Sequence, residues 1–371
     1  MQYHTKIVSN RRTLREFLRL PWRIYENDPN WVPPVTSEVR RTLNDKRNPY
    51  FANADLRLFV CCDQKGVPAA RIGIVIDRRY HKKYGVKSAF FGFFESIHDE
   101  DASRNLLDTA LQYCRGECIE ILEGPFNPNH YSELGIQVDK FGTRPTFFQT
   151  YNPEYYPALL EHYGFSRGAC VYTARNDNIR EYLRTALRSP ATRVADNGYT
   201  VRHLVPGNLE ADLEKLREVF NDSFAPNWHF LPVSREEYLY SAKFLRLVTD
   251  PKLIAIVEHN GIPAGVLMCV LDINPLLQKL QGSVGPIKYL RFLRQRRDIR
   301  TLIVYAVGVK KAYQRSRVIQ LLAEQLPLMA HSYDSLETTW ISRDNALTTK
   351  LAEKFGMLPD KHFAMYQMKL N

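Results

Sequence analysis

The chain has 371 residues, of which 44% are apolar and 25% are charged, and its formal net charge is +11. This length is enough for two domains that each bury a core, and no apolar stretch reaches the roughly 18 residues of a membrane span, which argues against an integral membrane protein. The amino terminus lacks the apolar block of a signal peptide, and the six cysteines form no Cys-x-x-Cys pair, so we expect a cytoplasmic protein with reduced thiols.

The first half of the chain predicts two helices followed by an antiparallel meander. Apolar residues recur at helical spacing over residues 14–25, where Pro21 predicts a kink, and a short helix is expected over residues 37–43. Strand-forming runs predict three strands, over residues 56–62, 69–77 and 88–95, separated by a turn and by a basic turn. A helix with one apolar face over residues 102–114 and a strand over residues 119–122 follow.

Residues 124–151 predict an irregular loop that is rich in Asn, Pro and aromatic residues. A loop of this length inside a compact domain is often functional. Its polar side chains are candidates for contact with a substrate: Asn127, Asn129, Tyr131 and Glu133. A helix capped by Asn152 and stopped by Gly164 and a strand over residues 169–174 are expected to close the first half.

The same order of predicted elements recurs after a polar connector at residues 188–198. A helix behind Asn208 and a second helix opened by Ser234 precede another meander. The remaining elements are strands over residues 253–258, 264–273 and 302–309, a helix over 318–329, a strand over 336–341, a helix from the Asn345 cap to Gly356 and a strand over 362–368. This duplication predicts two domains, 1–187 and 199–371, the second with a basic insertion at residues 274–300.

The order of the elements in both halves resembles the GNAT-type N-acetyltransferase fold. The strand at residues 91–95, the loop at 124–129 and the helix at 152–165 also resemble a bacterial tandem family of acyl-CoA N-acyltransferase-like proteins, which includes bacterial ceramide synthases. The resemblance implies an α/β protein with two tandem GNAT-like domains, each a mixed, mostly antiparallel central sheet flanked by helices. It also implies an enzyme that transfers an acyl group from acyl-CoA to an amine, expected to be a long-chain, sphingoid-like base.

The resemblance also indicates which half should bind the thioester. In this fold an opening between the fourth and fifth strands holds the pantetheine, and the following helix start holds the pyrophosphate. The first half carries three carboxylates there, at residues 98–101, so we expect no cofactor in that half. The turn of the second half is cationic but keeps only the Gln of the family's Arg/Gln-x-x-Gly-x-Gly/Ala motif, and a solvated basic helix start is the alternative. The candidate cofactor-binding residues are Val309, Lys310, Gln314, Arg315, Arg317 and Asn345.

Aminolysis of a thioester needs a base, a donor for the oxyanion and an acid for the leaving thiolate. The position where the family places its Tyr acid is Ala352. Glu337 and His130 are the candidate bases, with an exposed strand carboxylate and a hydrogen-bonded loop histidine as their structural alternatives. Further candidate substrate contacts are Trp228, Phe230 and Trp340, the first two with aromatic packing as the alternative. No metal is expected, because the histidines lack ligand spacing.

The insertion carries six cations against one acid over residues 285–300, together with an apolar face. A basic amphipathic helix is typical of a membrane-surface element, and a helix docked on its own domain is the alternative. We therefore expect peripheral contact with an anionic membrane, the bacterial inner membrane, with acyl-CoA and an amine acceptor as partners and no specific nucleic acid. An aminoacyl-tRNA-dependent transferase and a non-catalytic GNAT-fold binding protein are the two rival interpretations.

Overall fold

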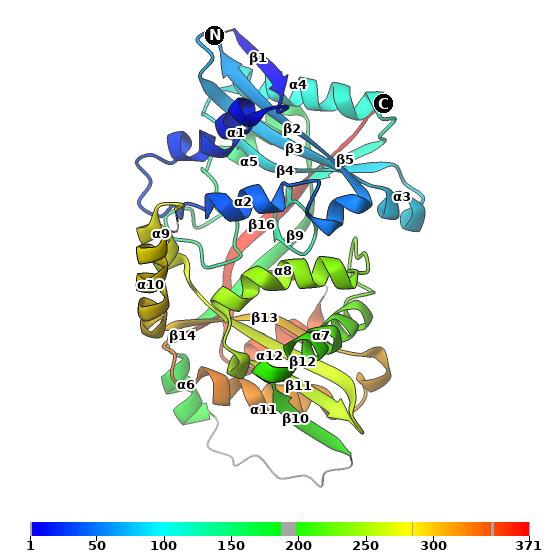
Figure 1. Cartoon of the computed structure of the whole chain (residues 1–371), viewed down its shortest axis with the longest axis vertical. Coiled ribbons are helices and arrows are strands. Elements are labelled where there is room, and N and C mark those ends of the chain that lie inside the picture. Colours follow the sequence, from blue (N-terminus) through cyan, green and yellow to red (C-terminus); the bar gives the residue numbers. More distant parts are fainter. Residues whose placement is uncertain (1, 187–197, 284, 343–344, 371) are drawn as a thin grey trace. The chain divides into compact units, whose positions relative to one another are not determined.

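The computed structural model describes residues 2–186, 198–283, 285–342 and 345–370. The chain forms two compact units (Figure 1). Unit 1 comprises Met1–Val171, Asn274–Arg291 and Lys361–Asn371, and unit 2 comprises Tyr172–Ile273 and Phe292–Asp360. The predicted connector at 188–198 lies, apart from Gly198, outside the described residues. The predicted domain boundaries, 1–187 and 199–371, follow the duplication in the sequence and remain a prediction.

Unit 1 is built on a mixed sheet with the strand order β1-β2-β3-β4-β5-β16. Its strands are β1 (Tyr3–Ile7), β2 (Ala54–Asp63), β3 (Pro68–Asp77), β4 (Ser88–Ser96), β5 (Ile121–Gly124) and β16 (Leu358–Lys369). The strands β4 and β5 are parallel, whereas β1–β2, β2–β3, β3–β4 and β5–β16 are antiparallel. The predicted meander is therefore present, and the last strand of the chain pairs with β5.

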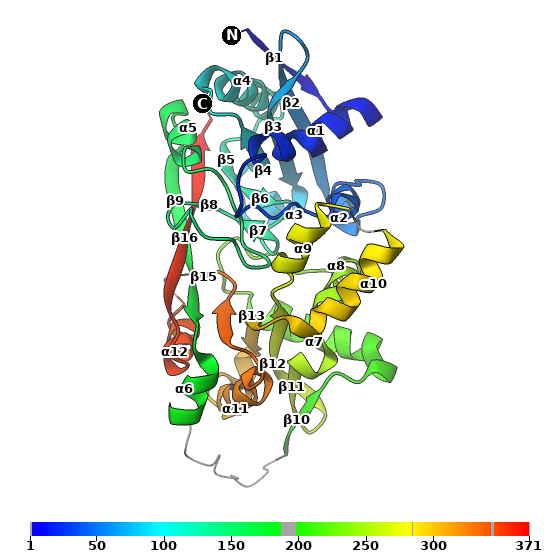
Figure 2. The ribbon, with the colours of Figure 1, turned by 90° about the vertical axis from the view of Figure 1, so that its left-hand side faces the viewer.

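Helices cover both faces of this sheet, as Figure 2 shows for α1 (Arg11–Ile24) and α4 (Glu100–Gly116). Because successive side chains of a strand point to opposite faces, Leu58 packs with Phe17 of α1, whereas Phe59 belongs to the core that includes the apolar residues of α4. The other helices of the unit are α2 (Thr36–Thr42), α3 (Arg78–Tyr84), α5 (Tyr156–Tyr163) and α9 (Asn274–Leu280). The basic turn predicted after the second strand is in fact the short helix α3.

The cap predicted at Asn152 is wrong. Helix α5 begins at Tyr156, and its N-cap residue Tyr155 makes no side-chain capping bond. Asn152 lies further back, where its Oδ1 accepts a hydrogen bond from Gln137 N at 2.7 Å and its Nδ2 donates to Gln137 O at 3.2 Å. The side chain of Asn152 thus forms hydrogen bonds with the backbone N–H and C=O groups of the long loop. Gly164 ends the helix as predicted, with a φ of 115°.

Unit 2 repeats this arrangement with the strand order β9-β14-β13-β12-β11-β10. Its strands are β9 (Ser166–Asn176), β14 (Ser335–Thr338), β13 (Thr301–Val309), β12 (Ile262–Leu271), β11 (Ile254–His259) and β10 (Tyr199–His203). Strand β9 belongs to this unit through its last residues, and Arg175 pairs with Glu337 of β14. The strand that closes the first half of the sequence therefore pairs in unit 2, and the strand that closes the second half pairs in unit 1.

The helices of unit 2 begin largely where the sequence predicts. They are α6 (Ile179–Ala186), which was not predicted, α7 (Leu209–Ser223), α8 (Arg235–Val248), α11 (Val318–Ala330) and α12 (Ala346–Lys354). Helix α10 (Pro286–Gln295) lies in the predicted insertion, and its residues up to Arg291 belong to unit 1. Ser234 and Glu237 form a capping box on α8, and Asn345 Oδ1 accepts a hydrogen bond from Thr348 N at 3.1 Å. Both predicted caps are confirmed. Asn208 precedes α7 without a side-chain capping bond.

Candidate functional site

In unit 2 the strands β13 and β14 part at the point where the fold is expected to open. They pair in parallel from Thr301 to Val304 and from Ser335 to Thr338, and β14 ends there while β13 continues to Val309. Tyr305 is the extra residue of a β-bulge, because its neighbours Val304 and Ala306 pair with consecutive residues of β12. Such bulges bend a strand and are frequent beside active sites. Thr339 Oγ1 donates to Tyr305 O at 3.0 Å, which links the chain after β14 to this bulge.

The predicted phosphate-binding turn follows β13. The buried Val309 leads into a short 3-10 turn, Lys311–Tyr313, and α11 begins only at Val318 with Arg317 as its N-cap residue. Lys310 forms an ion pair with Glu218 at 3.1 Å, and Lys311 N donates to Asp222 Oδ1 at 2.6 Å. The charge of Lys310 is thus already balanced within the protein.

The other predicted residues of the turn lie at the protein surface. The neutral Gln314 and the cation Arg315 are exposed, and the cation Arg317 is half-buried. The position before α11 lacks the small residues that would let a backbone loop approach a phosphate closely. Arg315 and Arg317 carry guanidinium groups that could hold a pyrophosphate, and Lys311 of the same turn is also an exposed cation.

Glu337 is fully buried rather than exposed on its strand. Its carboxylate accepts a hydrogen bond from Arg175 at 3.0 Å. Burial acts to lower the pKa of Arg175, but Glu337 and Asp177 outweigh it and leave the pKa raised. Glu337 could therefore act as a base only if this ion pair opened, and its catalytic role stays a prediction. Trp340, two residues beyond the end of β14, is half-buried.

The aromatic segment after α7 divides into an exposed and a buried part. Trp228 is 44% exposed, with its ring centroid 3.8 Å from that of His229. Phe230 is 2% exposed, and its ring centroid lies 6.0 Å from that of Phe220. Of the two predicted contacts, Trp228 is the one that a ligand could reach, whereas Phe230 packs in the interior.

In unit 1 the long loop packs beside the point where the corresponding strands part. The parallel pairing of β4 with β5 ends at Phe90 and Glu123. Beyond it, a Cβ atom on Gly92 would lie 1.9 Å from Phe126 O, and Phe93 N donates to Asn127 Oδ1 at 2.7 Å. The loop backbone thus packs directly against β4 beyond the point where the two strands part. The absence of a thioester site in the first half stays a prediction.

The acidic residue at the start of α4 in unit 1 forms hydrogen bonds within the protein. Asp99 Oδ1 accepts a hydrogen bond from Ala102 N at 3.1 Å, and Tyr3 donates to Asp99 Oδ2 at 2.8 Å. Burial acts to raise the pKa of Asp99, but these hydrogen bonds outweigh it and leave the pKa lowered. A carboxylate therefore satisfies the helix start at which a phosphate would otherwise bind.

The predicted loop residues organise the loop. The ring of His130 is buried, with its centroid 4.6 Å from that of Phe90 and 4.2 Å from that of Phe126. Asn127 Nδ2 donates to Glu133 at 3.3 Å, and Asn129 Oδ1 accepts from Tyr131 N at 3.1 Å. These contacts favour a structural role for His130. Its catalytic role stays a prediction.

A buried polar network around Glu95 of β4 was not predicted from the sequence. Its carboxylate accepts hydrogen bonds from Tyr156 at 2.7 Å and Tyr25 at 2.9 Å, and Arg71 lies 3.4 Å away. Burial raises the pKa of Glu95 despite these three partners. The only feature of the sequence that pointed to this network was Glu95 itself, a single carboxylate at the end of an apolar strand.

The Glu95 network joins α1, β3, β4 and α5 of unit 1. Burial first, and Glu95 second, raise the pKa of Tyr156. Carboxyl groups with raised pKa values are the type that proton transfer employs, so Glu95 is the titratable candidate in unit 1 that the geometry adds.

Within the described part of the chain, no group of three or more His, Cys, Asp or Glu side chains could hold a metal ion. No helix among the described residues has both the length and the apolar composition to cross a bilayer.

Solved structures show the same fold over the whole chain. A tandem GNAT protein from the clavulanic acid biosynthesis pathway aligns with 100% of this chain and 99% of its own length, with a TM-score of 0.58 and 12% identity. A probable N-acyltransferase from Enterococcus faecalis V583 aligns with all of this chain and 73% of its own, with a TM-score of 0.53 and 8% identity. The chain therefore has the tandem GNAT fold, and the predicted fold class is confirmed.

Curated proteins add relatives of nearly equal length. The bacterial ceramide synthase of Caulobacter vibrioides is 26% identical over 366 residues, which cover 96% of this chain and 95% of that protein. Protein YghO of Escherichia coli K12 is also 26% identical, over 97% of this chain and 94% of that protein. No family model matches the chain. The predicted resemblance to ceramide synthase-like tandem GNAT proteins is thus confirmed.

Proposed function

We propose that this protein is an N-acyltransferase that transfers an acyl group from acyl-CoA to the amine of a long-chain, sphingoid-like base. The observation that carries the proposal is the similarity to a bacterial ceramide synthase over 96% of the chain. The parting of β13 and β14 in unit 2 supports a thioester site in that unit. In unit 1 the loop backbone packs directly against β4 beyond the equivalent point, which favours a role on the acceptor side.

The reaction that we propose joins the amine nitrogen to the thioester carbonyl carbon and breaks the carbon–sulfur bond. A base takes one proton from the ammonium so that the neutral amine can attack, and the second nitrogen proton passes to the leaving thiolate, which departs as the thiol of free CoA. Arg315 and Arg317 are the groups proposed to hold the pyrophosphate. Glu337 and His130 remain the bases proposed from the sequence, and Glu95 is the alternative that the geometry adds.

The exposed face of α10 supports contact with a membrane surface. Ile287 is 79% exposed, Leu290 67% and Leu293 39%, while Phe292 is buried. The helix and the 3-10 turn after it also carry Lys and Arg side chains (Lys288, Arg291, Arg294, Arg296, Arg297). Exposed apolar groups beside cations match an anionic bilayer, where each nearby cation contributes roughly 1 kcal/mol. A long-chain amine resides in such a bilayer, so we propose a cytoplasmic enzyme at the periphery of the inner membrane.

Lipid analysis of cells tests this function. Cells that produce the protein should contain amide-linked acylated long-chain bases that cells without it lack. The Arg315→Ala/Arg317→Ala double variant should lower the product and raise the dissociation constant for acyl-CoA at least tenfold, about 1.4 kcal/mol. Lys252→Ala, an exposed cation elsewhere in unit 2, is the matched control and should change neither quantity.

Two outcomes would favour the rival interpretations. Binding of acyl-CoA without any amide product would indicate a non-catalytic binding protein, an interpretation favoured by the ion pair of Lys310 and by the buried Ala352. Salt-dependent binding of tRNA, with no binding of acyl-CoA, would indicate an aminoacyl-tRNA-dependent transferase.

A further inference from the structure

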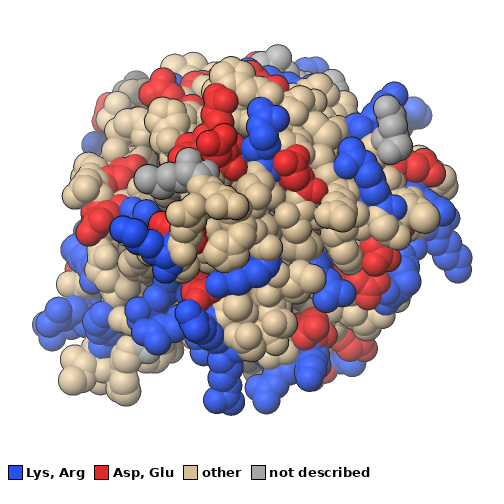
Figure 3. All heavy atoms as spheres, turned by 90° about the horizontal axis from the view of Figure 1, so that it is seen from above, with Lys and Arg blue, Asp and Glu red and all other residues tan. Residues whose placement is uncertain are grey.

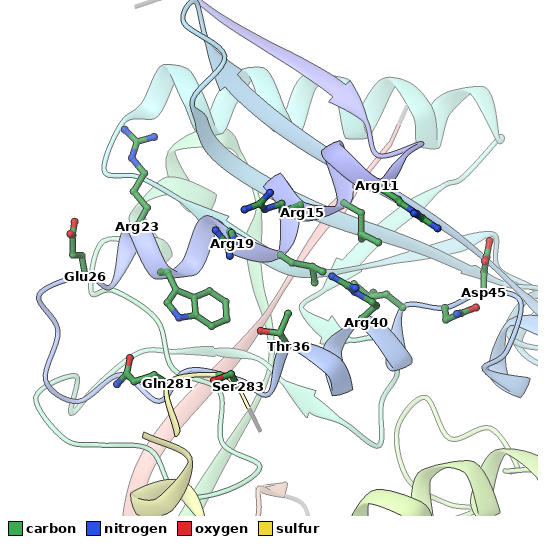
Figure 4. A pocket seen from close by; sticks show the side chains of 16 residues that line it. Arg11, Arg15, Arg19, Arg23, Glu26, Thr36, Arg40, Asp45, Gln281 and Ser283 are labelled. Carbon is green, nitrogen blue, oxygen red and sulfur yellow. The ribbon is translucent and has the colours of Figure 1, made fainter. Parts of the chain in front are cut away.

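A pocket of about 1130 Å³ lies within unit 1, and none of the residues of the proposed thioester site lines it. Figure 4 shows its wall of arginines on α1, with α2 and the segment after α9 on the other sides. Its cationic lining consists of Arg11, Arg15, Arg19, Arg23 and Arg40, and its acidic lining of Glu26 and Asp45. The lining therefore has an excess of positive charge.

The spacing along α1 explains this lining. Arg11, Arg15, Arg19 and Arg23 are four residues apart, so they form one row along the helix, roughly 18 Å long at 1.5 Å per residue. Leu14, Leu18 and Trp22 follow at the same interval and form a parallel apolar row in the same pocket. The two rows place cations beside an apolar surface along one elongated site.

Four of the five pocket arginines are available to a ligand, whereas Arg23 donates a hydrogen bond to Pro68 O at 2.5 Å. Arg12, which does not line the pocket, pairs with Glu16 at 3.2 Å. None of the described residues forms an ion pair with Arg11, Arg15, Arg19 or Arg40, and all four are exposed. Like charges four residues apart on a helix repel each other, so the row is unfavourable for the free protein. An anion in the pocket would remove this repulsion.

The insertion builds the remaining wall of the pocket. Gln278 Nε2 of α9 donates to Pro29 O at 2.7 Å and to Trp31 O at 3.0 Å, and Thr36 N donates to Gly282 O at 3.1 Å. Gly282 has a φ of 74°, and a Cβ atom there would lie 2.4 Å from the ring of Trp22. The wall is therefore fixed by specific contacts within unit 1.

We propose that this pocket binds a phosphate-bearing compound with a long acyl chain. Guanidinium groups match phosphate oxygens with paired N–H donors, and Leu14 and Trp22, which are half-buried, provide apolar contact for a chain, whereas Leu18 between them is buried in the core. The volume exceeds that of most small-molecule sites and fits an elongated ligand. Two sources carry this chemistry, an anionic phospholipid and a long-chain acyl-CoA. The proposal does not rest on the proposed function, because its residues all belong to unit 1.

Photoaffinity labelling of the full-length protein tests this proposal. The probes are phosphatidylglycerol in vesicles and palmitoyl-CoA in solution, each with a diazirine in its acyl chain, and a neutral diazirine-bearing palmitamide is the control. Mass spectrometry should find label on peptides that contain residues 11–26, 36–45 or 281–283. Label from phosphatidylglycerol alone assigns the site to a lipid headgroup, and label from palmitoyl-CoA alone assigns it to a nucleotide thioester.

Variants decide whether the pocket itself binds the probe. Arg15→Gln/Arg19→Gln/Arg40→Gln should lower labelling of these peptides at least tenfold, and Leu14→Gln should lower it while leaving the arginines in place. Arg12→Gln, on the same helix but outside the pocket, should label as the wild type does. Circular dichroism should show that all variants are folded. Labelling confined to other peptides, undiminished labelling of the triple variant, or equally strong labelling by palmitamide would overturn the proposal.

Discussion

Glu258 shows how paired charges stabilise unit 2 at the scale of single residues. Its Oε1 accepts hydrogen bonds from Lys215 at 2.7 Å and from Arg202 at 2.9 Å. Burial acts to raise the pKa of Glu258, but these cations outweigh it and leave the pKa lowered. A carboxyl group with a lowered pKa stabilises the folded state above its unfolded pKa, about 4.3, and this stabilisation is lost as the pH falls through the folded pKa.

Glu258→Gln should therefore reduce stability in a pH-dependent way. At pH 7 we expect a loss of about 1.5–3 kcal/mol, because hydrogen bonds to charged groups are lost. The difference from the wild type should shrink below about pH 4, where the wild-type carboxylate is itself protonated. Urea unfolding at pH 7, 5, 4 and 3 measures this, with the exposed Glu154→Gln as control. A difference that stays constant across this range would contradict the assignment.

Helix caps show what the sequence can and cannot predict at this scale. Ser234 and Asn345 were predicted correctly, because a cap bonds to backbone N–H groups only two or three residues away. Asn152 was predicted wrongly, because its partner Gln137 lies 15 residues away in the chain. The Glu95 network was missed for the same reason, since Tyr25, Arg71 and Tyr156 come from separate elements.

At the scale of elements, the contact between β4 and the long loop is the feature that distinguishes unit 1 from unit 2. Gly92 is its narrowest point, because Phe126 O occupies the space of a Cβ atom. Gly92→Ala should force the loop away from the strand and lower stability by about 1–3 kcal/mol. Gly116→Ala, where nothing lies within 4 Å, is the matched control and should be neutral or stabilising. Equal thermal unfolding temperatures for both variants would show that the loop is not packed there.

Helix α10 carries the prediction for membrane contact. Arg291→Glu/Arg294→Glu/Arg297→Glu should abolish co-sedimentation with phosphatidylglycerol vesicles, and wild-type binding should fall in high salt as the exposed charges are screened. The control Lys65→Glu/Lys252→Glu/Lys354→Glu reverses three exposed lysines outside this helix and matches the change in net charge. If both triple variants lose binding equally, total charge rather than α10 is responsible.

The order of the strands was predictable, but the pairing of the last ones was not. Local patterns of apolar residues define the meanders β2–β3–β4 and β11–β12–β13, whose neighbours are close in sequence. Strand β16 pairs with β5, more than 230 residues earlier, and no local pattern specifies such a partner. The sequence therefore predicts the duplicated fold but not this exchange of closing strands.

At the scale of the whole molecule, Lys and Arg outnumber Asp and Glu and give a formal net charge of +11. Figure 3 shows one face, on which Lys and Arg side chains lie at the lower left and also along the right of the view, with Asp and Glu side chains among them. The unit 1 pocket cannot be inferred from the net charge, because residues of α2 and of the segment after α9 complete its lining beside the arginine row of α1.

We propose that the protein forms an amide from acyl-CoA and a long-chain amine. The most direct measurement incubates purified protein with palmitoyl-CoA and sphinganine and quantifies the N-acyl product by mass spectrometry and free CoA with a thiol reagent. We predict equal amounts of amide and thiol, with far less product when a short soluble amine replaces sphinganine. Release of thiol without amide, or equal acylation of the soluble amine, would contradict the claim.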